Sequence, residues 1–143
     1  VIAFIEKAAK EEIYNNLLAE GFEVIEPQYT KKMYEDAMLS GSHNMQVILY
    51  TTEDFQYSSE GLASIEKAFV DLYFAITRNG YPLSLQELVR IYQNLSRLGN
   101  IDKKKLITVA SRRNIQYDIR FIVENRFITD SAIEFGKILR REE

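Results

Sequence analysis

Acidic side chains beside predicted strands are the first residues whose types and positions could do chemistry. Glu6 follows the apolar run VIAFI, and Glu23 and Glu26 lie in the run FEVIEP. Carboxylates that converge on a sheet, together with a lysine such as Lys7, can hold metal ions and position a water molecule, as nucleases require. Their spacing here matches no nuclease signature. We therefore keep a nuclease-like or nucleotidyltransferase-related enzyme only as the alternative to a non-enzymatic function.

The other common catalytic groups are scarce. The sequence has no cysteine, and its single histidine, His43, lies in the segment SGSHNM without metal-ligand spacing to Asp36 or Glu53. No serine lies in a G-x-S-x-G turn, and the six glycines are scattered singly instead of forming a phosphate-binding loop. We therefore predict no catalytic residue, no metal site and no cofactor.

A further acid, Asp71, interrupts the apolar run of SIEKAFVDLYFAI, residues 64–76. On a helix, Lys67 lies one turn before Asp71 on the same face, where the two side chains can form an ion pair. Since neither a base nor a nucleophile accompanies the acid, we predict that Asp71 is a structural anchor paired with Lys67.

Charge is distributed unevenly along the chain. Residues 1–60 hold 4 Lys or Arg and 11 Asp or Glu, whereas residues 61–143 hold 14 and 10. A basic strip can bind phosphates or an acidic protein surface, and the alternative is a solvated helix face. We predict contact with a partner or with phosphates for five basic residues: Lys103, Lys104, Lys105, Arg112 and Arg113.

The chain is rich in aromatic residues, with nine Tyr and eight Phe. Most of them fall at periodic apolar positions, which indicates core packing rather than stacking on bases. Tyr57 and Tyr81 are exceptions in loops beside polar residues, and we expect them at the rim of a partner contact.

The elements that must position these residues follow from the apolar pattern. VIAFI, FEVIEP and NMQVILYTT are short runs typical of buried strands, and helical patterns over residues 6–20 and 30–39 separate them. Thr30 is the expected N-cap of the second helix, and Gly21 the stop of the first. This order predicts a small, largely parallel βαβαβ sheet. DFQYSS, residues 54–59, is a further candidate strand.

From Ser64 onward the pattern is helical only. The predicted helices are residues 64–79, 84–98, 102–113, 116–126 and 129–141. Ser84 and Glu87 predict a capping box, and Asp102 predicts an N-cap. The expected fold class is α/β, with α+β as the alternative: a small sheet in about the first 60 residues, then an all-helical C-terminal half, as one domain over residues 1–143.

Length and composition bear on the number of domains and on the cellular compartment. A chain of 143 residues can form one domain with its own core. The lack of cysteine fits a reducing compartment, and no apolar run reaches the ~18–20 residues that cross a bilayer. We therefore expect a cytoplasmic protein with no membrane partner. Because the chain begins without Met and directly in an apolar segment, we expect it to be part of a longer protein.

Two segments resemble a known family. SIEK followed by FVDL, residues 64–67 and 69–72, and LITVASRRN, residues 106–114, are similar to segments of AbiEi-like antitoxins and related proteins found beside nucleotidyltransferase-type toxins. Together with residues 1–27, the resemblance covers most of the chain. Lys67 stands where arginine is usual in that pattern, and Asn114 where glycine often follows the arginine pair.

The resemblance implies a transcriptional regulator whose N-terminal winged helix-turn-helix reads the promoter. This chain would be its α/β C-terminal domain, without the DNA-binding domain. We see no helix-turn-helix in the pattern, and the net charge of -3 disfavours a main role in DNA binding. The expected function is a non-enzymatic regulatory or interaction domain. Its partner would be a cognate toxin or a second copy, with auxiliary contact to DNA phosphates.

Overall fold

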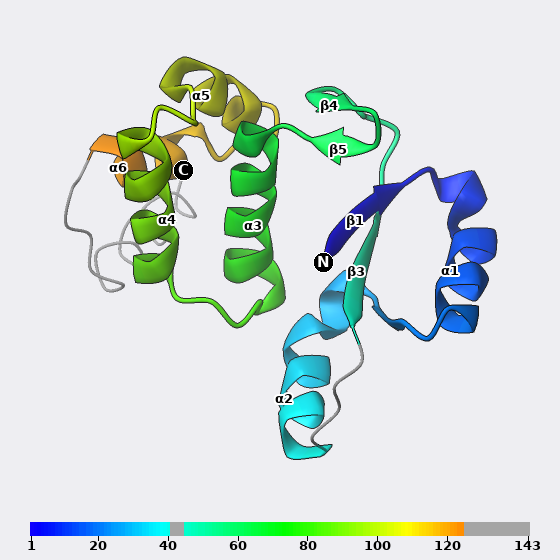
Figure 1. Cartoon of the computed structure of the whole chain (residues 1–143). Helices are drawn as coiled ribbons and strands as arrows, with labels where there is room; N and C mark the ends of the chain where they lie inside the picture. The colour runs from blue at the N-terminus through cyan, green and yellow to red at the C-terminus, as the bar shows by residue number, and fades with distance from the viewer. Residues whose placement is uncertain (41–44, 125–143) are drawn as a thin grey trace. The chain divides into compact units, whose positions relative to one another are not determined.

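The computed structural model describes residues 1–40 and 45–124, and the chain divides into two compact units (Figure 1). Unit 1 comprises residues 1–56 and 77–82, and unit 2 comprises residues 57–76 and 83–143. That the whole chain acts as the single domain expected from the sequence stays a prediction.

Unit 1 contains a three-stranded parallel sheet, which confirms the predicted βαβαβ order. Its strands are β1 (Ile2–Ile5), β2 (Glu23–Ile25) and β3 (Gln46–Thr51), in the spatial order β1-β3-β2. The central strand β3 pairs with both neighbours, and its Val47, Ile48 and Leu49 are buried. A parallel strand covered on both faces reads as an unbroken apolar run, which explains the consecutive apolar residues of this strand.

Both strand connections of unit 1 carry a helix that begins with a 3₁₀ turn. The turn η1 (Lys7–Ala9) leads into α1 (Lys10–Ala19), and η2 (Pro27–Tyr29) leads into α2 (Thr30–Ser40). At the end of α1 the Phe22 N–H donates to the Leu17 carbonyl (3.0 Å) and the Gly21 N–H to that of Leu18 (3.1 Å). Gly21 has φ +88°, so this Schellman motif confirms the predicted stop.

Thr30 does not cap α2, and that prediction is wrong. The 3₁₀ turn starts the helical conformation before Thr30, whose buried hydroxyl donates to the Pro27 carbonyl (2.8 Å). Pro27 can open the turn because its fixed φ suits a first helical position, where no N–H is needed.

Unit 2 contains helices and a short hairpin. The helices are α3 (Ile65–Asn79), α4 (Leu85–Arg97), α5 (Lys103–Ser111) and α6 (Gln116–Glu124), which confirms the helical prediction over residues 64–124. The last turn of α3, residues 77–79, belongs to unit 1. The end of the helix predicted over 116–126 and the one predicted over 129–141 lie outside the described residues.

The hairpin corrects the prediction for residues 54–59. Only β4 (Ser58–Ser59) is a strand there, and it pairs with β5 (Leu62–Ala63), which the sequence pattern did not predict. Glu60 and Gly61 both have positive φ, as a type I′ turn requires. Residues 54–57 are not a strand: residues 54–56 are exposed in a loop, and Tyr57 packs on the core of unit 2.

The core of unit 2 takes one apolar face from each helix. Its buried members are Phe69, Val70, Tyr73, Leu85, Leu88, Val89, Tyr92, Leu106, Val109, Ala110, Ile115, Ile119 and Ile122. Among residues 1–40 and 45–124, no helix combines the length and the apolar character that crossing a bilayer requires.

Ser84 and Asp102 are both confirmed as N-caps, whereas the Glu87 carboxylate, expected to complete a capping box, accepts from Arg90. The Ser84 hydroxyl accepts from the Glu87 N–H (3.1 Å) at the start of α4. At the start of α5, Asp102 Oδ1 accepts from the N–H groups of Lys104 (2.9 Å) and Lys105 (3.2 Å). These bonds satisfy helix N–H groups that have no partner within the helix.

Candidate functional site

The three carboxylates predicted on the sheet do not converge. β1 and β2 are the outer strands, roughly 10 Å apart across β3. Glu23 begins β2, and Glu26 follows its last residue, roughly 10 Å further along the strand. The register places Glu6, just after β1, at the level of Thr52, and Glu26 at the level of Leu49. The three acids therefore occupy three separate positions on the sheet.

Two of these carboxylates have local polar partners. Lys10 Nζ lies 3.2 Å from Glu26 Oε1, and Gln46 donates to Glu23 Oε2 (3.4 Å). Within the part of the chain that the structure describes, no three His, Cys, Asp or Glu side chains form a group that could hold a metal ion. His43 lies outside the described residues. The carboxylates on which the enzymatic alternative relies therefore do not share one site in unit 1.

Tyr34 on α2 of unit 1 has a phenol with a shifted pKa. Its ring meets the ring of Tyr81 edge to face, with the centroids 5.6 Å apart. Burial raises the pKa of Tyr34 to about 12, and the Tyr81 phenol and the Glu23 carboxylate act in the same direction. A phenol with this pKa stays neutral at neutral pH and is a poor proton donor, so we interpret the pair as structural.

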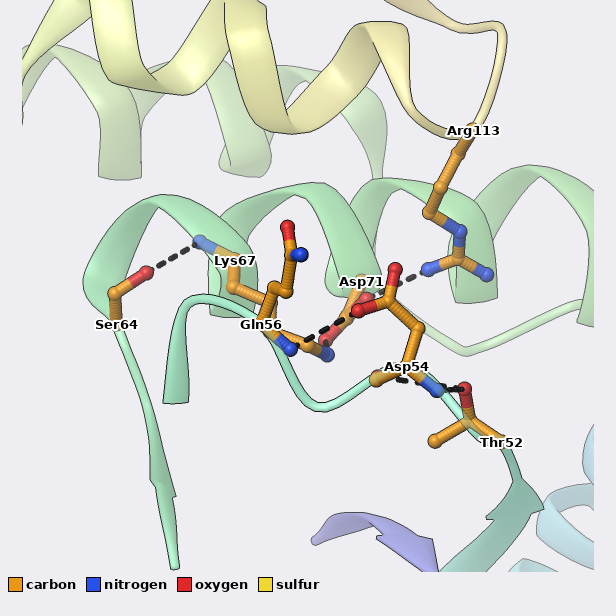
Figure 2. A network of polar contacts seen from close by, with 7 residues as sticks. All are labelled: Thr52, Asp54, Gln56, Ser64, Lys67, Asp71 and Arg113. Carbon is orange, nitrogen blue, oxygen red and sulfur yellow. Dashed lines mark hydrogen bonds and ion pairs between the residues drawn. The ribbon is translucent and has the colours of Figure 1, made fainter. Parts of the chain in front are cut away.

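The carboxylate of Asp71 in unit 2 binds two cationic side chains, those of Lys67 and Arg113 (Figure 2). Its side chain is 7% exposed, Lys67 Nζ lies 2.6 Å from Oδ2, and Arg113 Nη1 lies 2.6 Å from Oδ1. Such short contacts are typical of charge-assisted hydrogen bonds. The predicted pair with Lys67 is present. The second cation lies 42 residues further along the chain, where no local pattern points to it. We call this set of three side chains the Asp71 clamp.

Arg113 also packs against an aromatic ring of α3. Its guanidinium carbon lies 3.9 Å from the centroid of the Phe74 ring, which is within cation–π range. Since Asp71 and Phe74 lie one turn apart on α3, both contacts attach Arg113 to the same helix. A partner that bound Arg113 would have to compete with Asp71 for it.

The turn that carries Arg113 has a defined backbone. The Ile115 N–H donates to the Ala110 carbonyl (3.1 Å) and the Asn114 N–H to that of Ser111 (3.2 Å). Asn114 has φ +57°, so it takes the position that glycine usually occupies in a Schellman motif. Asparagine adopts this conformation more readily than other side-chain-bearing residues do, which explains why it can replace glycine there.

The other predicted contact residues lie at opposite ends of α5. Lys103–Lys105 form its first turn; the first two are exposed, and Nζ of the third lies 4.0 Å from a Glu66 oxygen. Arg112 is exposed at the other end, with its guanidinium carbon 5.9 Å from the centroid of the Tyr57 ring. A helix of nine residues is roughly 13 Å long, so the predicted strip divides into a lysine group and an arginine pair.

The lysine group lies where the helix dipole disfavours it. Cations at a helix N-terminus each destabilise by a few tenths of a kcal/mol, whereas Arg112 at the C-terminal end is favoured. The Asp102 cap offsets part of this effect. Helix stability therefore does not explain Lys103 and Lys104, which are both exposed.

Sequence reasoning missed two exposed aromatic side chains on α6. Tyr117 is 61% exposed, and Phe121, one turn later, is 37% exposed. Their positions around the helix axis could have revealed them, because both fall roughly opposite the buried Ile119. Tyr57 and Tyr81, expected at the rim of a partner contact, are half-buried, and their contact with a partner stays a prediction.

Comparison with known proteins adds no relative. No protein-family model, no curated protein and no solved structure matches the chain. The resemblance to AbiEi-like antitoxins therefore stays a prediction from the sequence, and the functional argument rests on the chain's own geometry.

Proposed function

We propose that this chain is a non-enzymatic interaction domain of an antitoxin-like regulator, and that it binds an anionic partner through the exposed cations of α5. The observation that carries the proposal is the Asp71 clamp. The clamp attaches the turn after α5 to α3, and so gives the cations on α5 a fixed direction.

Local charge supports an anionic partner although the whole chain is acidic. Residues 102–124 hold 6 Lys or Arg and 3 Asp or Glu. Of these acids, Asp102 caps α5, and the buried Asp118 accepts a hydrogen bond from the Tyr73 hydroxyl (2.6 Å). Since Asp71 pairs with Arg113 and Glu66 lies near Lys105, the excess of positive charge comes from the exposed cations of this segment, which attract anions and speed their association.

Contacts that restrict the cations also favour binding. Arg112 lies over the Tyr57 ring, and Lys105 faces Glu66. Each long side chain that binding would otherwise immobilise costs about 0.5–1.5 kcal/mol in lost rotamer freedom. Cations that already have restricted positions lose less, so the arrangement suits recognition more than a freely solvated helix face would.

The proposal is tested by chromatography of the full chain on immobilised heparin, used as a probe anion. The Lys104→Glu/Arg112→Glu variant should elute at clearly lower salt than the parent, because two phosphate-binding charges are reversed. The charge-matched control is Arg90→Glu/Arg97→Glu on α4, whose side chains are also exposed. If both double variants elute together, net charge alone explains retention and the proposal is refuted.

Arg113→Glu is a poor variant for this purpose. It would place a second carboxylate beside Asp71 and destabilise the clamp, so lost binding could reflect lost structure. Arg112→Glu avoids this problem because its side chain is exposed. Urea unfolding of each variant, with a midpoint equal to that of the parent, separates binding from stability.

A further inference from the structure

We infer that the anionic partner of this interaction domain is a single-stranded nucleic acid, whose phosphates contact cations on α5 and α6 and whose bases stack on Tyr117 and Phe121. The inference rests on the proposed function and narrows its partner to one class.

The first observation is the composition of the outer face of α6. Tyr117, Arg120, Phe121 and Glu124 fall on one side of this helix, and all four are exposed. Tyr117, at 61%, is the most exposed aromatic residue among residues 1–40 and 45–124. Neither ring belongs to the core formed by the described residues, to which α6 contributes Ile119 and other buried side chains of its opposite face.

The second observation is that cations lie beside these rings along the chain. Arg120 lies on the same helix face, between Tyr117 and Phe121 in sequence. Arg112 lies in the four-residue turn that joins α5 to α6, and the Asp71 clamp holds that turn through the next residue, Arg113. Proteins that bind single strands without strong sequence preference combine these two features, a cationic track for the backbone and aromatic rings for the bases.

The exposed rings distinguish a single strand from the other anionic partners. In a duplex the base faces are stacked on one another, so a side-chain ring cannot lie flat on them without opening the helix. An acidic protein surface would match the cations, but to cover the two rings it would also have to present apolar or aromatic side chains beside its acids. A single strand supplies phosphates and unstacked bases together.

The salt dependence of binding can be estimated from the exposed cations. Lys103, Lys104, Arg112 and Arg120 are exposed and lie on α5, α6 or the turn between them. Four phosphate contacts on a single strand give a slope of log K against log salt of about −3, since each contributes about −0.7. Each stacked ring contributes about tenfold or more to affinity, independently of salt.

The experiment measures fluorescence anisotropy of a labelled oligothymidylate with the full chain over a series of salt concentrations. Tyr117→Ala should weaken binding about tenfold or more and leave the salt slope unchanged. Arg120→Gln should instead lower the magnitude of the slope by about 0.7. Tyr29→Ala, which removes a 55% exposed tyrosine from unit 1, is the matched control and should bind like the parent.

Conservative variants keep the test independent of folding. Tyr117→Phe retains a ring and should bind nearly as well as the parent, whereas Tyr117→Leu retains apolar volume without a ring and should bind like Tyr117→Ala.

Three results would overturn the inference while leaving the proposed function intact. They are equal binding of the parent and the Tyr117→Ala variant, equal competition by duplex DNA of the same length, and no oligonucleotide binding by a chain that heparin still retains. The proposed function fails separately, if charge reversal on α5 leaves heparin retention no lower than the control does.

Discussion

Asp71→Asn should destabilise unit 2 by about 2–3 kcal/mol. The amide keeps the volume of the side chain but removes the charge that binds Lys67 and Arg113, and it leaves these two cations close together. Removal of one partner from a buried ion pair costs about 3–5 kcal/mol. The side chain of Asp71 is 7% exposed but that of Arg113 is 26% exposed, so solvent screens part of the loss and we expect a value below that range.

The assay is equilibrium unfolding in urea, followed by helical circular dichroism. In a thermal scan the same loss would lower the melting temperature by about 10 °C for a chain of this size. The matched control is Glu87→Gln, which removes a carboxylate from an exposed ion pair on α4 and should cost less than about 0.5 kcal/mol. A double-mutant cycle with Arg113→Gln should give a coupling energy of about 1 kcal/mol or more.

Equal stability of Asp71→Asn and the parent would refute the structural role of the clamp. It would also remove the observation that carries the proposed function, because the turn after α5 would then have no demonstrated attachment to α3. A loss of stability without coupling to Arg113 would mean that Lys67 alone is responsible.

Three further predictions concern other contacts. Tyr73→Phe removes the hydroxyl that donates to the buried Asp118 and should cost about 1.5–3 kcal/mol in urea unfolding; a loss under about 0.5 kcal/mol would contradict the buried bond. Gly80→Ala should destabilise the protein more than Gly99→Ala. Both glycines have positive φ, but only at position 80 would the new Cβ meet another atom, the Cβ of Lys31 at 2.7 Å. Equal losses of stability in the two variants would refute this expectation. In an ultraviolet titration of parent against Tyr34→Phe, the Tyr34 phenol should titrate near pH 12. Because the folded pKa exceeds the unfolded value of about 10, its stabilising contribution is complete below pH 10 and is lost as pH rises towards 12, and titration near pH 10 would contradict the burial.

Most of the fold could be predicted because its signals are local. The apolar run of β3 and the caps at Ser84 and Asp102 depend only on residues a few positions apart. The errors arose where a local signal had two interpretations. Thr30 resembles an N-cap, but a proline three residues earlier had already started the helical turn. The β4–β5 hairpin has strands of two residues each, too short to leave a period in the sequence.

The candidate site could be predicted only in part. The distribution of charged residues along the sequence pointed to the basic residues near α5. It could not distinguish those that pair with side chains of this chain from those that face solvent. Arg113 and Arg112 are adjacent in sequence; one reaches Asp71 across 42 residues, and the other is exposed. That difference depends on tertiary packing. The exposed ring of Tyr117 could have been found, since helical phase alone places it opposite the core.

The strand order of unit 1 has a consequence for folding kinetics. Ile2 pairs with Ile48, so this pairing must close a loop of roughly 45 residues, whereas α5 and α6 meet across a short turn. Contacts distant in sequence form slowly, and β1 is therefore expected to join the sheet after the helical hairpin of unit 2 has formed. Until it does, β3 presents an unpaired apolar edge, Val47–Leu49, and the refolding chain is most prone to aggregation at that stage.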